Sequence, residues 1–199
     1  MIAVVDYGAG NLFSVRNALD YIGEKSEITS DPAVLERADG LILPGVGAFP
    51  DAMRMLGEAG LVPILREQAA KKPLLGICLG MQALFETGME FHETPGLGLI
   101  PGTVDRIQTV YKIPHIGYNE LKFGIPSPLL AGIDEGACVY FVHSFRAYTA
   151  EEYIAASCDY GCEIPALVQR GNVFGAQFHP EKSGETGLAI LRNFGGLTR

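Results

Sequence analysis

The sequence has no tryptophan, no run of basic residues and no apolar stretch that approaches the length of a membrane span. Its 15 Lys and Arg residues are outnumbered by 23 Asp and Glu residues, which gives a formal net charge of −8. Nucleic-acid surfaces are usually basic, so this charge argues against nucleic-acid binding as the main function. A membrane helix needs about 20 apolar residues, so we expect no membrane insertion.

Cysteine is also scarce, with four residues at positions 78, 138, 158 and 162. Cys158 and Cys162 have no second pair of Cys or His nearby, so we expect no metal site, and nothing in the sequence calls for a cofactor. The N-terminus lacks the basic region and cleavage site of a signal peptide. A cytoplasmic, reducing setting is therefore predicted, and it suits a thiol that must stay free.

What is present is a globular composition, with 48% hydrophobic residues in 199, and we expect a single domain over residues 1–199. In the first half, short apolar runs alternate with stretches of helical periodicity, which predicts parallel βαβ units. Strands are expected at 2–5, 26–29, 40–43 and 74–77, and helices at 12–22, 50–56, 61–70 and from 81 to at least 86.

The second half has a different pattern, because short strand-like segments are separated by turns with Gly or Pro. We expect these segments to add antiparallel strands to the parallel sheet, followed by one closing helix. The expected strands are 97–107, 112–122, 138–143, 153–158, 165–169 and 173–178, and the helix is 185–194.

The central motif is Gly76-Ile77-Cys78-Leu79-Gly80, between an expected strand and an expected helix. This pattern is typical of a nucleophile elbow, with Cys in place of Ser. The small residues around Cys78 let the strand and the helix approach closely. A helix N-terminus there would favour the thiolate. The alternative is a buried structural cysteine, which is the commoner fate of a single Cys.

A base and an acid follow the last expected strand, at His179 and Glu181. In an extended chain, side chains two residues apart lie on one side, so Glu181 can orient His179. Cys78, His179 and Glu181 therefore form the candidate catalytic triad. His143 is the rival base, but it has no carboxylate two residues further on.

Three loops are expected to meet at the carboxyl edge of the sheet, namely residues 6–11, 44–49 and the flanks of Cys78. The glycine-rich segment Pro44-Gly45-Val46-Gly47 is the candidate oxyanion hole, because its glycines allow a backbone N–H to turn toward a substrate carbonyl. The N–H of Leu79, which follows the nucleophile, is the expected second donor.

Together these motifs resemble the class I glutamine amidotransferases, and within them the glutaminase subunits of imidazole glycerol phosphate synthase. The resemblance covers nearly the whole chain and implies a flavodoxin-like, three-layer α/β fold with a mixed, mostly parallel central sheet. It rests on V-V-D-Y-G-A-G-N-L (4–12), L-P-G-V-G-A-F (43–49), G-I-C-L-G-M-Q (76–82), P-H-I-G-Y-N (114–119), Y-F-V-H-S-F (140–145) and Q-F-H-P-E-K-S (177–183).

The resemblance implies that Cys78 attacks the amide of glutamine and forms a glutamyl thioester, and that ammonia passes to a (β/α)8-barrel cyclase subunit in a heterodimer of histidine biosynthesis. The implied oxyanion donors are Val46, Gly47 and Leu79. The implied substrate-binding residues are Gln82, Glu90, Ser144 and Phe145. The implied partner-interface residues are Asn11, Tyr118, Asn119 and Lys182.

Two positions depart from the family pattern. Tyr118 stands where the family usually has Trp, and Phe145 stands where it usually has Tyr. Both remain aromatic, but their hydrogen-bonding groups differ.

Three other functions fit parts of the sequence. The chain could be the glutaminase subunit of pyridoxal phosphate synthase, although that family has a different glycine-rich oxyanion segment. It could be a cysteine-dependent hydrolase that acts alone on amides or γ-glutamyl peptides. It could also be a binding module without activity, but the intact Cys78, His179 and Glu181 argue against that.

Overall fold

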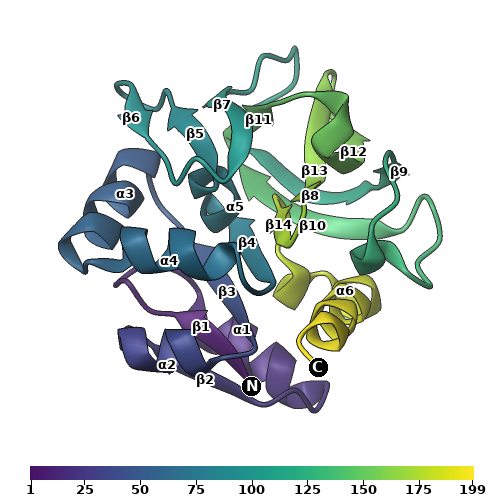
Figure 1. Cartoon of the computed structure of the whole chain (residues 1–199). Helices are drawn as coiled ribbons and strands as arrows, with labels where there is room; N and C mark the ends of the chain where they lie inside the picture. Colours follow the sequence, from purple (N-terminus) through teal and green to yellow (C-terminus); the bar gives the residue numbers. More distant parts are fainter.

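A mixed eight-stranded sheet runs through the molecule in the computed structural model, which describes residues 1–199 (Figure 1). Neighbouring strands from β2 to β14 are parallel, and those from β14 to β9 are antiparallel, which confirms the mixed sheet expected from the sequence. The strand expected at 173–178 is an exception, because β14 runs parallel to β4 instead of being an antiparallel addition. In sheet order the strands are β2 (Ser26–Thr29), β1 (Ile2–Val5), β3 (Gly40–Gly45), β4 (Leu74–Cys78), β14 (Val173–Ala176), β13 (Glu163–Arg170), β12 (Ile154–Asp159) and β9 (Lys122–Phe123).

Helices cover both faces of this sheet and complete the predicted three layers. Successive side chains of a strand point to opposite faces. Ile2 and Val4 of β1 therefore join one core with α1 (Leu12–Tyr21) and α6 (Gly184–Leu197). Their neighbours Ala3 and Val5 join a second core, which contains side chains of α2 (Pro32–Arg37), α3 (Phe49–Glu58) and α4 (Leu61–Ala69).

Two smaller sheets stand apart from the central one, so the prediction that all later strands extend it is only partly right. One is an antiparallel ribbon of β8 (His115–Glu120) and β10 (Cys138–His143). The other has the order β11 (Phe145–Tyr148), β7 (Ile100–Arg106), β5 (Phe85–Gly88) and β6 (Thr94–Pro95). Short 3-10 turns are η1 (Pro128–Leu130), η2 (Glu151–Tyr153) and η3 (Pro180–Lys182).

The helix expected from residue 81 to at least 86 is wrong in its extent. Helix α5 spans only Leu79–Ala83, and β5 begins at Phe85. Leu84 and Phe85 are fully buried in the second core, and β5 pairs with β7. Tertiary packing and strand pairing thus override a local helical pattern. Strands β6 and β11 were also not predicted.

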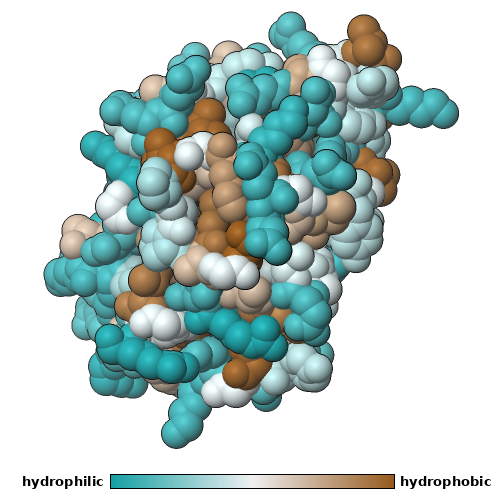
Figure 2. Space-filling model, turned by 90° about the vertical axis from the view of Figure 1, so that its right-hand side faces the viewer, coloured by the Kyte–Doolittle hydropathy of each residue, from teal (hydrophilic) through white to brown (hydrophobic).

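Hydrophobic side chains on one flank of the molecule form separate patches among hydrophilic ones (Figure 2). This flank is the right-hand side of Figure 1, where α6 and β9 lie. No helix has both the length and the apolar character needed to cross a bilayer.

The close contact between α5 and β3 requires glycine at position 80, and this requirement can be tested. A Cβ at Gly80 would lie 1.8 Å from the carbonyl oxygen of Leu43, which is backbone and cannot swing aside. Gly80→Ala should therefore destabilise the protein by roughly 1–3 kcal/mol or more. The matched control is Gly57→Ala at an exposed position of α3, where no atom lies within 4 Å of the added Cβ, and it should stabilise the protein by about 0.5–1 kcal/mol. Urea unfolding of both variants measures the difference, and equal effects would contradict the packing argument.

Candidate active site

Cys78 ends β4 in a backbone conformation that non-glycine residues rarely adopt, with φ of +54° and ψ of −110°. Such strain costs energy and persists only where surrounding packing holds it, most often at functional sites. The Cys78 residue is 7% exposed and lines a cavity. This geometry fits the predicted nucleophile elbow and disfavours a purely structural cysteine.

Glycines in the elbow and at the end of the neighbouring strand β3 allow the elbow to form. A Cβ at Gly76 would lie 2.6 Å from the carbonyl oxygen of Gly80. A Cβ at Gly45 would lie 2.7 Å from the Gly80 nitrogen. The chain thus turns back on β3 and β4 at distances that only glycine permits, as the spacing of the motif predicts.

His179 and Glu181 are in direct contact, with His179 Nδ1 2.8 Å from Glu181 Oε1. The predicted reason for this contact is wrong, because the strand ends at Ala176 and His179 is the N-cap of turn η3. The turn, rather than extended chain, brings the two side chains together. Both are almost fully buried, at 3% and 1% side-chain exposure.

The charge balance around His179 favours its protonated form. Burial is the largest influence and lowers the pKa of His179, but hydrogen bonds to Cys78 and Glu181 and their negative charges outweigh it. The pKa of His179 is raised from 6.5 to about 9. Since Nδ1 is held by Glu181, the ring meets Cys78 through Nε2. His179 is therefore protonated at neutral pH and can supply a proton beside Cys78.

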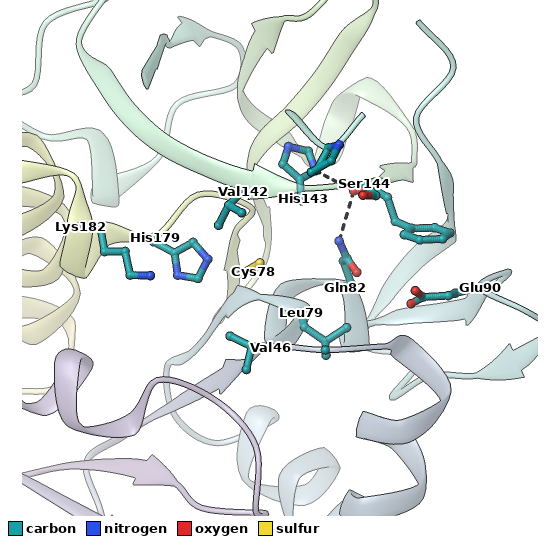
Figure 3. A pocket seen from close by; sticks show the side chains of 13 residues that line it. Val46, Cys78, Leu79, Gln82, Glu90, Val142, His143, Ser144, His179 and Lys182 are labelled. Atoms are coloured by element: carbon teal, nitrogen blue, oxygen red, sulfur yellow. Dashed lines mark hydrogen bonds between the residues drawn. The ribbon is translucent and has the colours of Figure 1, made fainter. Parts of the chain in front are cut away.

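The cavity beside Cys78 has a volume of about 380 Å³, which suits a small polar molecule. His179 and Lys182 lie on one side of it and Glu90 on the other, with Gln82 between them (Figure 3). Among the predicted site residues, the structure brings to this cavity Cys78, His179, Val46, Gly47, Leu79, Gln82, Glu90, Ser144, Phe145 and Lys182.

The polar side chains of the cavity are held by specific contacts. Gln82 Nε2 donates to the Phe145 carbonyl at 3.2 Å and to Gln177 Oε1 at 3.0 Å. Gln177 Nε2 in turn lies 3.8 Å from Cys78 Sγ. Glu90 Oε2 accepts from the Phe49 N–H at 2.7 Å, at the start of α3, where no side chain of the helix provides a cap. One carboxylate oxygen of Glu90 is thus engaged by the helix.

The candidate oxyanion loop lies at the cavity mouth. Val46 is 48% exposed, and Gly47 has a φ of +106°, which favours glycine. No atom lies within 4 Å of where a Gly47 Cβ would be, so the space beside this residue is open. Leu79 begins α5 directly after Cys78.

The residues predicted at a partner interface do not lie together in the cavity, and only Lys182 lines it. Tyr118 on β8 is 63% exposed and donates its hydroxyl to the Lys182 carbonyl at 2.8 Å. Asn119 points to the other side of the same strand and donates to the Asp159 carbonyl at 2.8 Å. Asn11 is the N-cap residue of α1 and accepts from the Ser14 hydroxyl.

Three residues of the site were not predicted. Pro114 and Val142 line the cavity, and the fully buried Gln177 connects Gln82 to Cys78. Gln177 opens the Q-F-H-P-E stretch, so its position beside His179 was the available signal. His143, considered as the rival base, also lines the cavity, but its Nδ1 is 2.7 Å from the Phe145 carbonyl.

Replacing Glu181 should shift the titration of His179. In Glu181→Gln the supporting charge is lost, so burial should bring the pKa of His179 down from about 9. A raised pKa stabilises the folded state fully below pH 6.5, and this contribution is lost as the pH rises through 9. In the wild type, the stability that the raised pKa of His179 contributes, and that is lost over this pH range, is on the order of 3 kcal/mol.

The measurement combines an NMR titration of His179 with urea unfolding at pH values on either side of this window. The unfolding free energy of the wild type should fall more between pH 6.5 and 9 than that of Glu181→Gln. Parallel pH profiles for the two proteins would contradict the described pairing.

Comparisons with known proteins agree with this geometry. The sequence profile of the family described as glutamine amidotransferase class-I matches residues 3–196. The imidazole glycerol phosphate synthase subunit HisH of Bacillus cereus is 53% identical over 198 residues, which cover 99% of this chain and 95% of that protein. The corresponding subunit of Bacillus anthracis is 50% identical over the same coverage.

Solved structures support the fold. A crystal structure described as a glutamine amidotransferase matches with a TM-score of 0.78 at 22% identity, covering 100% of this chain and 99% of that one. The structure of PurLQS from Thermotoga maritima matches with a TM-score of 0.76 at 21% identity, covering 97% of this chain and 96% of that one. The chain therefore belongs to the class I glutamine amidotransferase family, in the group that contains the HisH subunits of imidazole glycerol phosphate synthase.

Proposed function

We propose that this chain is the glutaminase subunit of imidazole glycerol phosphate synthase and that it hydrolyses L-glutamine for a (β/α)8 cyclase subunit in histidine biosynthesis. The observation that carries the chemistry is the strained Cys78, facing a cavity beside a His179 whose Nδ1 is held 2.8 Å from buried Glu181. The kinship with HisH subunits supports the pathway.

In the first half of the reaction, the thiolate of Cys78 attacks the side-chain amide carbon of glutamine, and an S–C bond forms. Imidazolium His179 gives its Nε2 proton to the amide nitrogen, the C–N bond breaks and ammonia leaves. Glu181 holds the imidazole ring through Nδ1 and stabilises its charged form. The product on the enzyme is a glutamyl thioester.

In the second half, neutral His179 takes a proton from water as the water oxygen attacks the thioester carbon. The C–S bond then breaks, glutamate leaves and releases its carboxylic proton to solvent, and the thiolate–imidazolium pair is restored. Both halves pass through a tetrahedral oxyanion. The N–H groups of the Val46–Gly47 segment and of Leu79 are the proposed donors to that oxygen.

Recognition of glutamine is assigned to the part of the cavity away from His179. The carboxylate of Glu90 faces this part and suits the α-ammonium group, while its other oxygen caps α3. The Gln82 amide nitrogen is used by Phe145 and Gln177, so its carbonyl oxygen is available to the ligand. The backbone of Ser144 and Phe145 forms the wall beside it.

The proposed docking face for the cyclase surrounds the cavity mouth. Val46 and Val142 line the cavity and are 48% and 36% exposed. Val142 pairs across the ribbon with Ile116, which is 59% exposed, and Tyr118 lies two residues further along β8. This row of exposed apolar side chains fits a partner that would cover the cavity and receive ammonia.

Replacing Cys78 should separate glutamine hydrolysis from the ammonia-dependent reaction of the cyclase. Cys78→Ala should abolish glutamine hydrolysis, because no thioester can form, but leave cyclase turnover with free ammonia near the wild-type rate. Cys138→Ala, at an exposed position away from the cavity, is the control and should keep both activities. Steady-state assays with glutamine and with ammonium salt measure this. Retained glutamine-dependent turnover in Cys78→Ala would contradict the assignment of Cys78 as the nucleophile.

The free chain should be a poor glutaminase that its partner activates, because glycines on both sides of Val46 let that peptide turn to an unproductive orientation at little steric cost. One lost oxyanion donor costs roughly 10²–10³ in rate, so activation of that order is expected. Glutamine hydrolysis should rise on adding cyclase and rise again on adding its nucleotide ligand. Full activity in the free chain, unchanged by either, would show a preformed site.

Gly47→Ala tests the loop itself. Alanine disfavours a φ of +106° but meets no atom, so it should lower the activated rate by about tenfold or more without clashing. Gly23→Ala also places alanine at a positive φ, +81°, in open space but away from the cavity. It should leave glutamine turnover unchanged, and an equal loss in both variants would assign the effect to general destabilisation.

A further inference from the structure

Two buried histidines outside the proposed triad face each other on the β8–β10 ribbon. His115 and His143 are directly opposite in the strand register and are 2% and 6% exposed. His115 Nδ1 lies 3.1 Å from His143 Nε2. The reaction described above gives neither histidine a role, although His143 lines the cavity.

The contacts at the two ends fix which nitrogen carries each proton. His143 Nδ1 is 2.7 Å from the Phe145 carbonyl oxygen, which can only accept, so His143 Nδ1 must carry the hydrogen. In neutral His143, Nε2 is then an acceptor, and His115 Nδ1 donates to it. His115 Nε2 is left as an acceptor, 3.4 Å from the Asn119 side-chain nitrogen.

Both rings remain neutral at physiological pH, as this arrangement of donor and acceptor nitrogens requires. Burial lowers the pKa of His115 to about 4 and that of His143 to about 3. His115 is further held by stacking on Tyr160 and Phe141, with ring centroids 4.0 Å and 4.7 Å away. The hydrogen bonds thus run in one direction, from Asn119 through His115 and His143 to Phe145.

The Phe145 carbonyl is where this chain of hydrogen bonds meets the glutamine cavity. It accepts from His143 Nδ1 on one side and from Gln82 Nε2 on the other, and the two dashed lines converge on it in Figure 3. Gln82 continues through Gln177 to Cys78. Two donors on one carbonyl leave it no free lone-pair direction, so they fix its peptide plane.

The other face of the same ribbon carries the exposed Ile116, Tyr118 and Val142, because side chains alternate along each strand. The ribbon has only two strands, so its position depends on packing rather than on a wide sheet. It is also tied to the triad turn, since the His179 N–H donates to the Tyr140 carbonyl at 3.0 Å. A shift of its outer face therefore moves the histidines on its inner face.

We propose that His115 and His143 are positioning residues. They hold the Phe145 carbonyl, and with it the Ser144–Phe145 wall and Gln82, in the shape that binds glutamine, and they couple this wall to the outer face of the ribbon. The identity of the ligand and of the docking partner rests on the function proposed above, whereas the hydrogen-bonded order rests on the contacts themselves.

Two substitutions of His143 cut different hydrogen bonds. The side-chain nitrogen of Asn reaches the place of Nδ1, so His143→Asn keeps the donor to Phe145 but loses the link to His115. The side-chain oxygen of Gln reaches the place of Nε2, so His143→Gln keeps the acceptor for His115 but loses the donor to Phe145. Each variant breaks one contact in the same buried place, so the two are matched controls for stability.

The experiment measures glutamine affinity by calorimetry in a Cys78→Ala background, and glutaminase KM and kcat in the complex with the cyclase. His143→Gln should raise Kd and KM about five- to tenfold, the worth of one hydrogen bond, with a smaller change in kcat. His143→Asn should keep Kd and KM within about threefold but lose most of the partner's stimulation of kcat.

The remaining outcomes overturn the proposal. Equal losses of affinity in the two variants would indicate a packing role. Unchanged affinity and unchanged stimulation in both variants would show that these hydrogen bonds contribute neither to glutamine binding nor to activation by the partner. His115→Phe keeps a ring for the stack but removes the donor, so it should behave like His143→Asn. The wild-type complex is assayed in parallel, and a wild type without glutaminase activity would contradict the proposed function rather than the positioning role.

Discussion

The close approach of the β4–α5 turn to β3 is the constraint on which the rest of the site depends. At Gly76 and Gly80, added Cβ atoms would overlap backbone, so only glycine lets Cys78 turn at a φ of +54° into the cavity. The cost of that strained residue is offset by the buried sheet beneath it, where β4 pairs on both sides with parallel strands. The proposed nucleophile thus lies at the end of a strand that is paired on both sides.

Charge inside the cavity is organised around the same turn. His179 is buried and would be neutral by itself, but Glu181 on one ring nitrogen and Cys78 on the other reverse this preference. His143 has similar burial and no carboxylate partner, and its pKa moves in the opposite direction. Environment therefore separates two histidines of one cavity into a protonated ring, the proposed proton donor, and a neutral hydrogen-bonding ring.

The sequence was most informative where a rule is local. The parallel half follows from short apolar runs, and the elbow follows from glycine spacing. Prediction failed where distant contacts decide, as at Phe85, which packs into the second core and pairs in β5 instead of extending α5. The His179–Glu181 contact was expected, but through extended chain rather than turn η3. The alignment of His115 with His143 depends on ribbon register, which no local pattern contains.

The central claim is that Cys78 alone reacts with glutamine, and the four cysteines of the chain allow a direct test. The complex is treated with a diazoketone analogue of glutamine, and the modified peptides are mapped by mass spectrometry while residual glutaminase activity is followed. The account predicts one label per chain, on Cys78, lost activity in proportion to labelling, and protection by excess glutamine. Glutamine turnover that survives complete labelling of Cys78, or inactivation that follows labelling of another cysteine, would contradict it.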